Sequence, residues 1–121
     1  MGLKTMARGV EWVALATSIP DNEKMLELQG AGDWRAIVTY CYSLAYCGRT
    51  MSDGFIPKAA LPRICGTTKV AHALVNVGLW KYSADGKGWI IPDWAEYQVT
   101  SEKFLQRQEA GKKGAEARWS H

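Results

Sequence analysis

The feature that most constrains the fold is a pair of short helical segments separated by one glycine. Residues 58–65 (KAALPRIC) predict a short helix. Gly66 allows a tight turn, and Thr67 is a residue type that often caps a helix N-terminus. A second helix over residues 67–77 ends at Gly78, since glycine is preferred just beyond a helix C-terminus. This order predicts a helix-turn-helix.

The second of these helices is amphipathic. Its apolar side chains recur at helical spacing and are expected to face the core; they are Val70, Ala71, Ala73, Leu74 and Val77. The polar side chains on the opposite side are Thr68, Lys69, His72 and Asn76. These residue types, together with Thr67, can bond to base edges and phosphates, which makes them candidate DNA contacts. The alternative is an ordinary solvated helix face.

A β-hairpin is predicted directly after this helix. Residues 79–82 and 89–91 are β-prone runs, and the loop between them contains Asp85-Gly86, a strong hairpin signal. A hairpin in this position is the wing of a winged helix. Lys81 and Lys87 place positive charge along it and at its tip. Phosphate contact and simple solubility of the hairpin both explain these two lysines.

The distribution of charge favours a polyanionic partner. Residues 54–92 carry five basic side chains against one acidic, whereas residues 10–53 carry six acidic against three basic. A basic stripe of this kind is typical of phosphate-binding surfaces. The basic residues that we assign to such a surface outside the helix and hairpin are Lys58, Arg63, Lys112, Lys113 and Arg118. For the last three, the alternative is a solvated terminus.

The N-terminal half is predicted to form the scaffold. Residues 10–17 predict a strand, and Asp21 is expected to cap a short helix that follows. The longest helix is expected to begin at Asp33 and to end at Gly48. Its expected core stripe is Trp34, Ile37, Val38, Cys41, Leu44 and Ala45. Tyr42 and Tyr46 lie off this stripe, either on a dimer surface or beneath the C-terminal helix.

The C-terminal part is predicted to be helical and polar. A short helix is expected over residues 93–98, and Ser101 is expected to cap a last helix that Gly111 and Gly114 weaken. Order is expected to fade after about Gln108. Five of the six tryptophans are expected in the core, because each ring buries a large area; they are Trp12, Trp34, Trp80, Trp89 and Trp94.

Several classes of function are excluded by what the sequence lacks. Three cysteines without a CxxC pair predict reduced thiols, with neither a disulfide framework nor a zinc site. Residues 66–69 (GTTK) depart from the P-loop pattern, and nothing places an acid near His72 for nucleophilic catalysis. No apolar run reaches membrane-spanning length. We therefore expect no enzyme activity, no cofactor, no metal and no membrane partner.

The order of several short strings resembles the N-terminal winged-helix domain of phage replisome organiser proteins and the related DnaD-like primosome proteins. The strings are Trp12, DNEKMLEL at 21–28, DGFIP at 53–57, LVNVGLW at 74–80, GWIIPDWAEYQ at 88–98 and GKKGAEARW at 111–119. The resemblance implies DNA binding in replication initiation, in a bacteriophage or other mobile element, and self-association. Organiser proteins usually continue into a second domain, so this chain is either a truncated piece or a stand-alone DNA-binding protein.

The sequence therefore predicts an α+β winged helix over residues 9–98 with a two-stranded wing. Residues 99–121 are expected to form a basic tail, helical or partly disordered. The expected partner is double-stranded DNA in the cytoplasm of a bacterial host. A homodimer or higher oligomer is expected, because one copy offers few contacts. The alternatives are a phage transcriptional regulator and a winged-helix docking module that binds a host replication or transcription factor.

Overall fold

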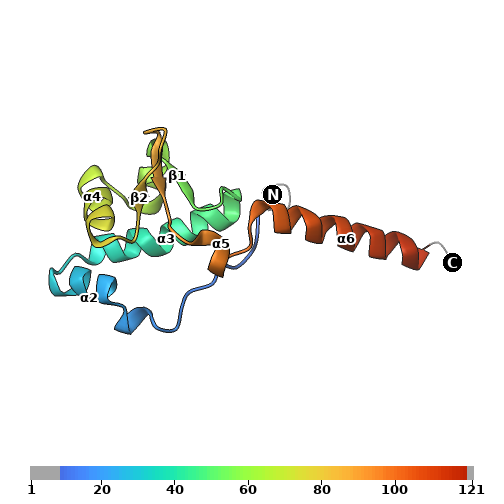
Figure 1. Cartoon of the computed structure of the whole chain (residues 1–121), viewed down its shortest axis with the longest axis horizontal. Coiled ribbons are helices and arrows are strands. Elements are labelled where there is room, and N and C mark those ends of the chain that lie inside the picture. Colours follow the sequence, from blue (N-terminus) through green and yellow to red (C-terminus); the bar gives the residue numbers. More distant parts are fainter. Residues whose placement is uncertain (1–8, 120–121) are drawn as a thin grey trace.

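The computed structural model describes residues 9–119, and it has the α+β class predicted from the sequence. Its α-helices are α2 (Glu23–Gly30), α3 (Trp34–Thr50), α4 (Thr68–Val77), α5 (Trp94–Tyr97) and α6 (Ser101–Trp119). Two 3-10 helices are η1 (Ile19–Asp21) and η2 (Lys58–Ile64), and the strands are β1 (Phe55–Pro57), β2 (Lys81–Tyr82) and β3 (Gly88–Ile90). Figure 1 shows α4, the sheet and η2 gathered around α3, with α6 projecting away from them.

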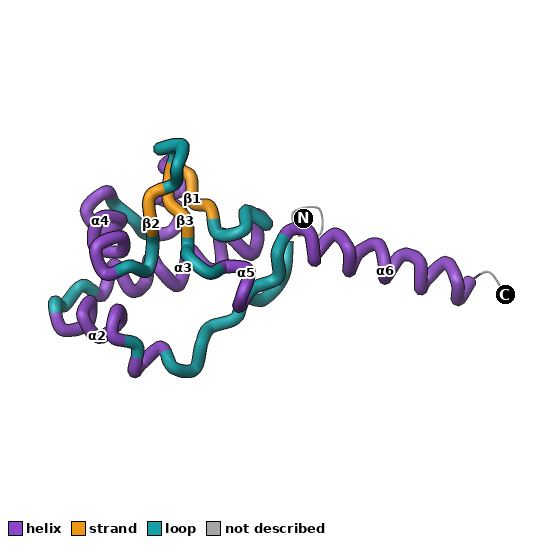
Figure 2. The backbone as a smooth tube through the Cα atoms, viewed as in Figure 1, coloured by secondary structure: helices purple, strands orange, loops and turns teal. Residues whose placement is uncertain are grey.

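The three strands form one antiparallel sheet in the order β1-β3-β2. Trp89 of β3 pairs with Ile56 on one side and with Tyr82 on the other. The predicted hairpin is therefore present, and β1 adds a third strand where the sequence indicated only a short extended piece (Figure 2). This third strand ties the hairpin to the start of η2.

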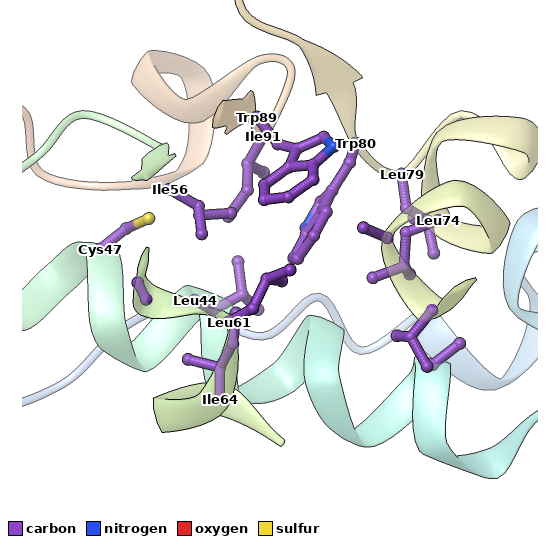
Figure 3. Close-up of a cluster of buried hydrophobic side chains, with 14 of the residues drawn as sticks. Leu44, Cys47, Ile56, Leu61, Ile64, Leu74, Leu79, Trp80, Trp89 and Ile91 are labelled. Atoms are coloured by element: carbon purple, nitrogen blue, oxygen red, sulfur yellow. The ribbon is translucent and has the colours of Figure 1, made fainter. Parts of the chain in front are cut away.

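The core lies between α3, α4, η2 and the sheet. Trp80 and Trp89 pack with their ring centroids 5.6 Å apart, and Leu74 and Ile56 are fully buried nearby (Figure 3). Burying two such large rings together supplies much of the apolar area that a small domain needs. The predicted burial of Trp80, Trp89 and Trp94 is confirmed.

Helix α3 turns a different face to the core from the one predicted. Its buried residues are Ala36, Thr39, Ser43, Leu44, Cys47 and Gly48. Of the predicted stripe, only Leu44 is buried. Ile37 and Cys41 are half-buried, with Ile37 packed against the core, and Trp34, Val38 and Ala45 are exposed. Small and hydroxyl-bearing side chains face inward because neighbouring backbone approaches closely there: Thr39 Oγ1 donates to Cys65 O at 3.1 Å. The prediction failed because both faces of α3 are apolar enough to be a core stripe.

The segment over residues 10–17 is not a strand. Its backbone bonds to groups outside any sheet: Val10 N donates to Gly48 O, and Ala14 exchanges two hydrogen bonds of 2.8 and 2.7 Å with the Gln98 side-chain amide. We call this segment the arm. Trp12 on the arm is 83% exposed, so its predicted place in the core is wrong.

Two helix boundaries in the N-terminal half differ from the prediction. Asn22, not Asp21, caps α2, because the Asn22 side chain accepts from the backbone N–H of Lys24 and Met25. Helix α3 begins after Asp33 as expected, and the Asp33 side chain accepts from Ala36 N. It continues past Gly48 to Thr50, because Gly48 keeps helical geometry and Met51 adopts the left-handed conformation that ends the helix.

Three predictions about helix α6 are wrong: which residue caps it, where it ends, and that it is shorter than α3. Its first turn is capped by Thr100, whose hydroxyl accepts from Lys103 N, while Ser101 bonds through its N–H and its hydroxyl to the Asp53 carboxylate at 2.7 Å each. The helix continues through Gly111 and Gly114 to Trp119 instead of fading near Gln108, and it is longer than α3. Among the helices described, none combines the length and the apolar character required to cross a bilayer.

Candidate nucleic-acid interface

The turn between η2 and α4 is held by helix α3. The carbonyl oxygen of Cys65 accepts from Arg35 Nε at 2.8 Å and from Thr39 Oγ1 at 3.1 Å. Cys65 adopts a left-handed conformation (φ 61°), and Gly66 packs so closely that an added Cβ would lie 2.9 Å from a methyl carbon of Leu61. Because two side chains of a long helix fix this carbonyl, the turn sets the direction in which α4 leaves it.

Helix α4 is delimited by local signals. The Thr67 side chain accepts from Val70 N at 3.2 Å, which satisfies an N–H that has no partner within the helix. At the other end, Gly78 has a φ of 88° and its N–H bonds to the carbonyls of Leu74 and Val75. The predicted start and end of this helix are confirmed.

The polar face of α4 is exposed as a ridge. Its buried residues are Val70, Ala71 and Leu74, which pack against the core. The four polar residues predicted on the opposite side, Thr68, Lys69, His72 and Asn76, are all exposed. Thr67 is half-buried because its hydroxyl is occupied at the cap. We call the four exposed residues the α4 ridge.

The hairpin loop beside the ridge is internally bonded. Ser83 Oγ donates to Asp85 Oδ1 at 2.7 Å, and Lys87 N donates to the same oxygen at 2.9 Å. These hydrogen bonds, first that of Ser83 and then that of Lys87, lower the pKa of the Asp85 carboxyl below its usual value. The one acidic residue of this region is thus used to shape the loop, while Lys87 remains exposed.

A second basic position lies beside the hairpin. Lys58, at the start of η2, donates its backbone N–H to the carbonyl of Lys87 at 3.2 Å. The structure therefore brings the exposed residues Lys58 and Lys87 together, although 29 positions separate them in the chain. Arg63 is also exposed, near the other end of η2. Lys81 is exposed on β2.

Tyr82 lies beside the α4 ridge, and it was not predicted from the sequence as a candidate contact. Its ring lies edge-on to the His72 imidazole, with centroids 6.3 Å apart, and it is 56% exposed. It joins the α4 ridge to β2, since one residue comes from each element. The sequence feature that could have identified Tyr82 is its position at the end of a β-prone run directly after the amphipathic helix.

The basic residues of α6 are not part of this surface. Lys112 and Lys113 are exposed on α6, and Arg118 lies farther along the same helix. In Figure 1, α4 is near one end of the molecule and α6 extends from the other. The basic residues of α6 are therefore distant from the α4 ridge.

Within the part of the chain that the structure describes, no three His, Cys, Asp or Glu side chains are grouped so that they could hold a metal ion. Comparison with known proteins adds no assignment: no family model, no curated protein and no solved structure matches the chain. The resemblance to replisome organiser proteins stays a prediction.

Proposed function

We propose that this chain is a winged-helix protein that binds duplex DNA without catalysing a reaction. The observation that carries the proposal is the α4 ridge: four exposed polar residues on a helix whose other face is buried, beside a hairpin that bears lysines. Helix α4 has 10 residues and so is about 15 Å long, a length that fits a major groove. In this arrangement Thr68, Lys69, His72 and Asn76 face bases and backbone.

The hairpin and η2 supply the phosphate contacts. Lys58 and Lys87 lie together at one end of the sheet and Lys81 lies on β2, so positive charge flanks the ridge. Phosphate contacts fix the register of a protein on DNA, whereas base contacts carry sequence information. The biological role that we propose is initiation of bacteriophage or mobile-element replication. That role depends on the resemblance of the sequence strings, with transcriptional control as the second candidate.

A salt titration with charge-reversal variants tests DNA binding. The affinity of the full chain for a labelled random-sequence duplex is measured by fluorescence anisotropy between about 50 and 200 mM salt. The proposal predicts a steep loss of affinity with salt, because bound phosphates release counterions. Lys69→Glu with Lys87→Glu should abolish binding at 100 mM salt while the circular dichroism spectrum stays unchanged. Lys103→Glu, an exposed lysine outside the surface, is the control and should change affinity less than threefold.

The same experiment identifies the competing function. If the parent chain binds duplex DNA weakly and without salt dependence, the winged helix is a docking module for an acidic protein surface. If the double variant binds as tightly as the parent, the DNA contacts lie elsewhere, and α6 becomes the first place to look.

A further inference from the structure

A cavity of about 370 Å³ lies between the arm and the core. Its inner wall is formed by buried apolar side chains of the core, namely Met25, Leu44, Leu79, Ile91 and Trp94. Its outer wall is the arm, which contributes residues 14–16. In Figure 1 the arm runs below α3, from the α6 end of the molecule to α2. Pockets that hold small molecules have volumes of about 300–1,000 Å³, so this cavity is large enough for a small ligand.

The arm closes the cavity through a small number of hydrogen bonds. The backbone N–H and C=O of Ala14 bond to the side-chain amide of Gln98, which also lines the cavity. Leu15, the next residue along the arm, lines the cavity and is nevertheless 55% exposed. Because one side chain holds this part of the arm, the arm can move aside without disturbing the core, and a ligand can enter.

A fixed positive charge lies at one side of the cavity. Of the described residues that line it, two are charged: Lys24 and Asp93, one of each sign. The Lys24 ammonium donates to Gly78 O at 3.3 Å, and a Cβ added at Gly78 would lie 3.5 Å from Lys24 Cε. These contacts hold the ammonium at the C-terminal end of α4, where the helix dipole favours a cation. An ammonium has three N–H donors, so it can bind an anion while it keeps the bond to Gly78.

The negative charge of the cavity is not used by the fold. Asp93 precedes α5 and has a left-handed backbone conformation, with a φ of 61°. An aspartate in that position usually accepts a hydrogen bond from an N–H in the first turn of the helix. Within the described residues the Asp93 side chain makes no such bond, and the residue is exposed. Its carboxylate is therefore available to a cation.

Trp94 adds a donor next to this carboxylate in the chain. It lines the cavity and is 6% exposed, and its indole N–H has no acceptor among the residues that the structure describes. Buried polar groups normally have a hydrogen-bond partner. The cavity thus combines an apolar wall, one cation, one anion and a donor that the protein leaves unsatisfied.

We propose that this cavity binds a free α-amino acid with an apolar side chain. The ligand carboxylate pairs with Lys24, the ligand ammonium pairs with Asp93, and the apolar side chain packs against the inner wall. The pairing of charges selects this class of ligand. A ligand with only a negative charge would leave Asp93 unpaired and be repelled by it, and a ligand with only a positive charge would meet the same difficulty at Lys24.

A titration followed by heteronuclear NMR tests the proposal on the full chain without DNA, so its failure is independent of the failure of the proposed function. L-Phenylalanine should shift the amide signals of Leu15, Lys24 and Leu79 with a dissociation constant between about 10 µM and 1 mM, as expected for a ligand of this size. 3-Phenylpropanoate lacks the ammonium and phenethylamine lacks the carboxylate. Each should bind about three- to tenfold more weakly, because one charge pair at a partly exposed site is lost.

Two variants assign the charges. Lys24→Gln should weaken binding of L-phenylalanine about three- to tenfold without weakening binding of phenethylamine, which has no carboxylate to lose. Asp93→Asn keeps a residue type that tolerates the left-handed conformation, and it should weaken L-phenylalanine equally without weakening 3-phenylpropanoate. Lys103→Gln and Glu102→Gln, at exposed positions on α6, are the matched controls and should bind as the parent does. The NMR spectrum of each variant also shows whether it is folded.

Three results overturn the proposal. The first is a parent chain whose amide signals do not move at about 10 mM L-phenylalanine, a concentration well above the expected dissociation constant. The second is either single-charge analogue binding as tightly as the amino acid. The third is L-phenylalanine binding to Lys24→Gln and Asp93→Asn as tightly as to the parent.

Discussion

The indole nitrogen of Trp80 donates a hydrogen bond to the hydroxyl of Ser43, 3.3 Å away, in the buried centre of the protein. Ser43 in turn donates to the carbonyl of Tyr40 at 2.6 Å. The Ser43 hydroxyl therefore makes two hydrogen bonds, one with a core tryptophan and one with the backbone of α3. The bond explains why a polar residue is fully buried on α3, and it fixes the sheet end that carries Trp80 against that helix.

Replacing Ser43 by Ala should lower the free energy of unfolding by about 1–3 kcal/mol, because a buried N–H loses its partner. Urea unfolding followed by tryptophan fluorescence measures the change. Thr50→Ala is the control: its hydroxyl bonds to Tyr46 O at 2.9 Å on the exposed side of the same helix. A Ser43→Ala variant within 0.5 kcal/mol of the parent would show that another group satisfies the indole.

Gly88 is required where β1 and β3 meet. An added Cβ there would overlap the carbonyl of Ile56 in the paired strand. Gly88→Ala should therefore destabilise the protein by about 1–3 kcal/mol or more, because backbone cannot move aside as a side chain can. Gly86→Ala provides the comparison. Gly86 has open space around it and a φ of 70°, so only the left-handed conformation is penalised, by about 1–2 kcal/mol. Thermal unfolding should rank Gly88→Ala as the less stable variant.

The parts of the fold that follow from nearby residues could be predicted from the sequence. Thr67 caps α4 through a bond to a residue three positions away, and Gly78 ends the same helix through its own left-handed conformation. The hairpin loop follows from Asp85-Gly86 in the same way. Because these signals are local, the α4 ridge could be located without coordinates.

The predictions that were wrong concern parts of the fold that depend on residues far apart in the chain. Helical periodicity shows which residues of α3 share a face, but it does not show which apolar face meets the core; that is decided by Cys65 and Trp80, which bond to Thr39 and Ser43. The arm is held by Gln98, 84 positions from Ala14, so its backbone needs no strand partner there. Trp12 lies on the same arm and is exposed.

Tyr82 should contribute to DNA affinity through its contact with His72. Tyr82→Ala removes the ring that lies edge-on to the imidazole and leaves His72 less well positioned. An aromatic pair of this kind contributes about 0.5–1.5 kcal/mol, so affinity for a duplex should fall about two- to tenfold. Tyr97→Ala, at a 68% exposed position on α5, is the matched control and should bind as the parent does. Equal losses in both variants would remove Tyr82 from the proposed surface.

Cys47 should make the protein less stable at alkaline pH. Burial raises the pKa of its thiol from 9.0 to about 11, against smaller opposing effects of hydrogen bonds from Ser52 and Gly54. The folded state therefore favours the neutral thiol, and this contribution is complete below pH 9 and is lost as pH rises through 11. The loss amounts to about 2–3 kcal/mol.

Comparison with Cys47→Ala isolates this effect from the other groups that titrate in the same range, such as Tyr40, whose pKa burial also raises. The free energy of unfolding is measured by urea at pH 8 and at pH 11. The parent should lose about 2–3 kcal/mol more than the variant between these two values. Parallel losses in both proteins would show that the pKa of Cys47 is the same in the folded and the unfolded chain.

Helix α6 should become more stable when its glycines are replaced. Gly111 and Gly114 have nothing within 4 Å of an added Cβ, and each costs about 1 kcal/mol relative to alanine in a helix interior. Gly111→Ala with Gly114→Ala should slow amide hydrogen exchange in α6 by about tenfold or more, whereas exchange in α3 and the midpoint of global unfolding stay unchanged. The two effects separate because α6 projects from the rest of the structure (Figure 1) and frays independently of the core. A rise in the global midpoint would show instead that α6 unfolds together with the core.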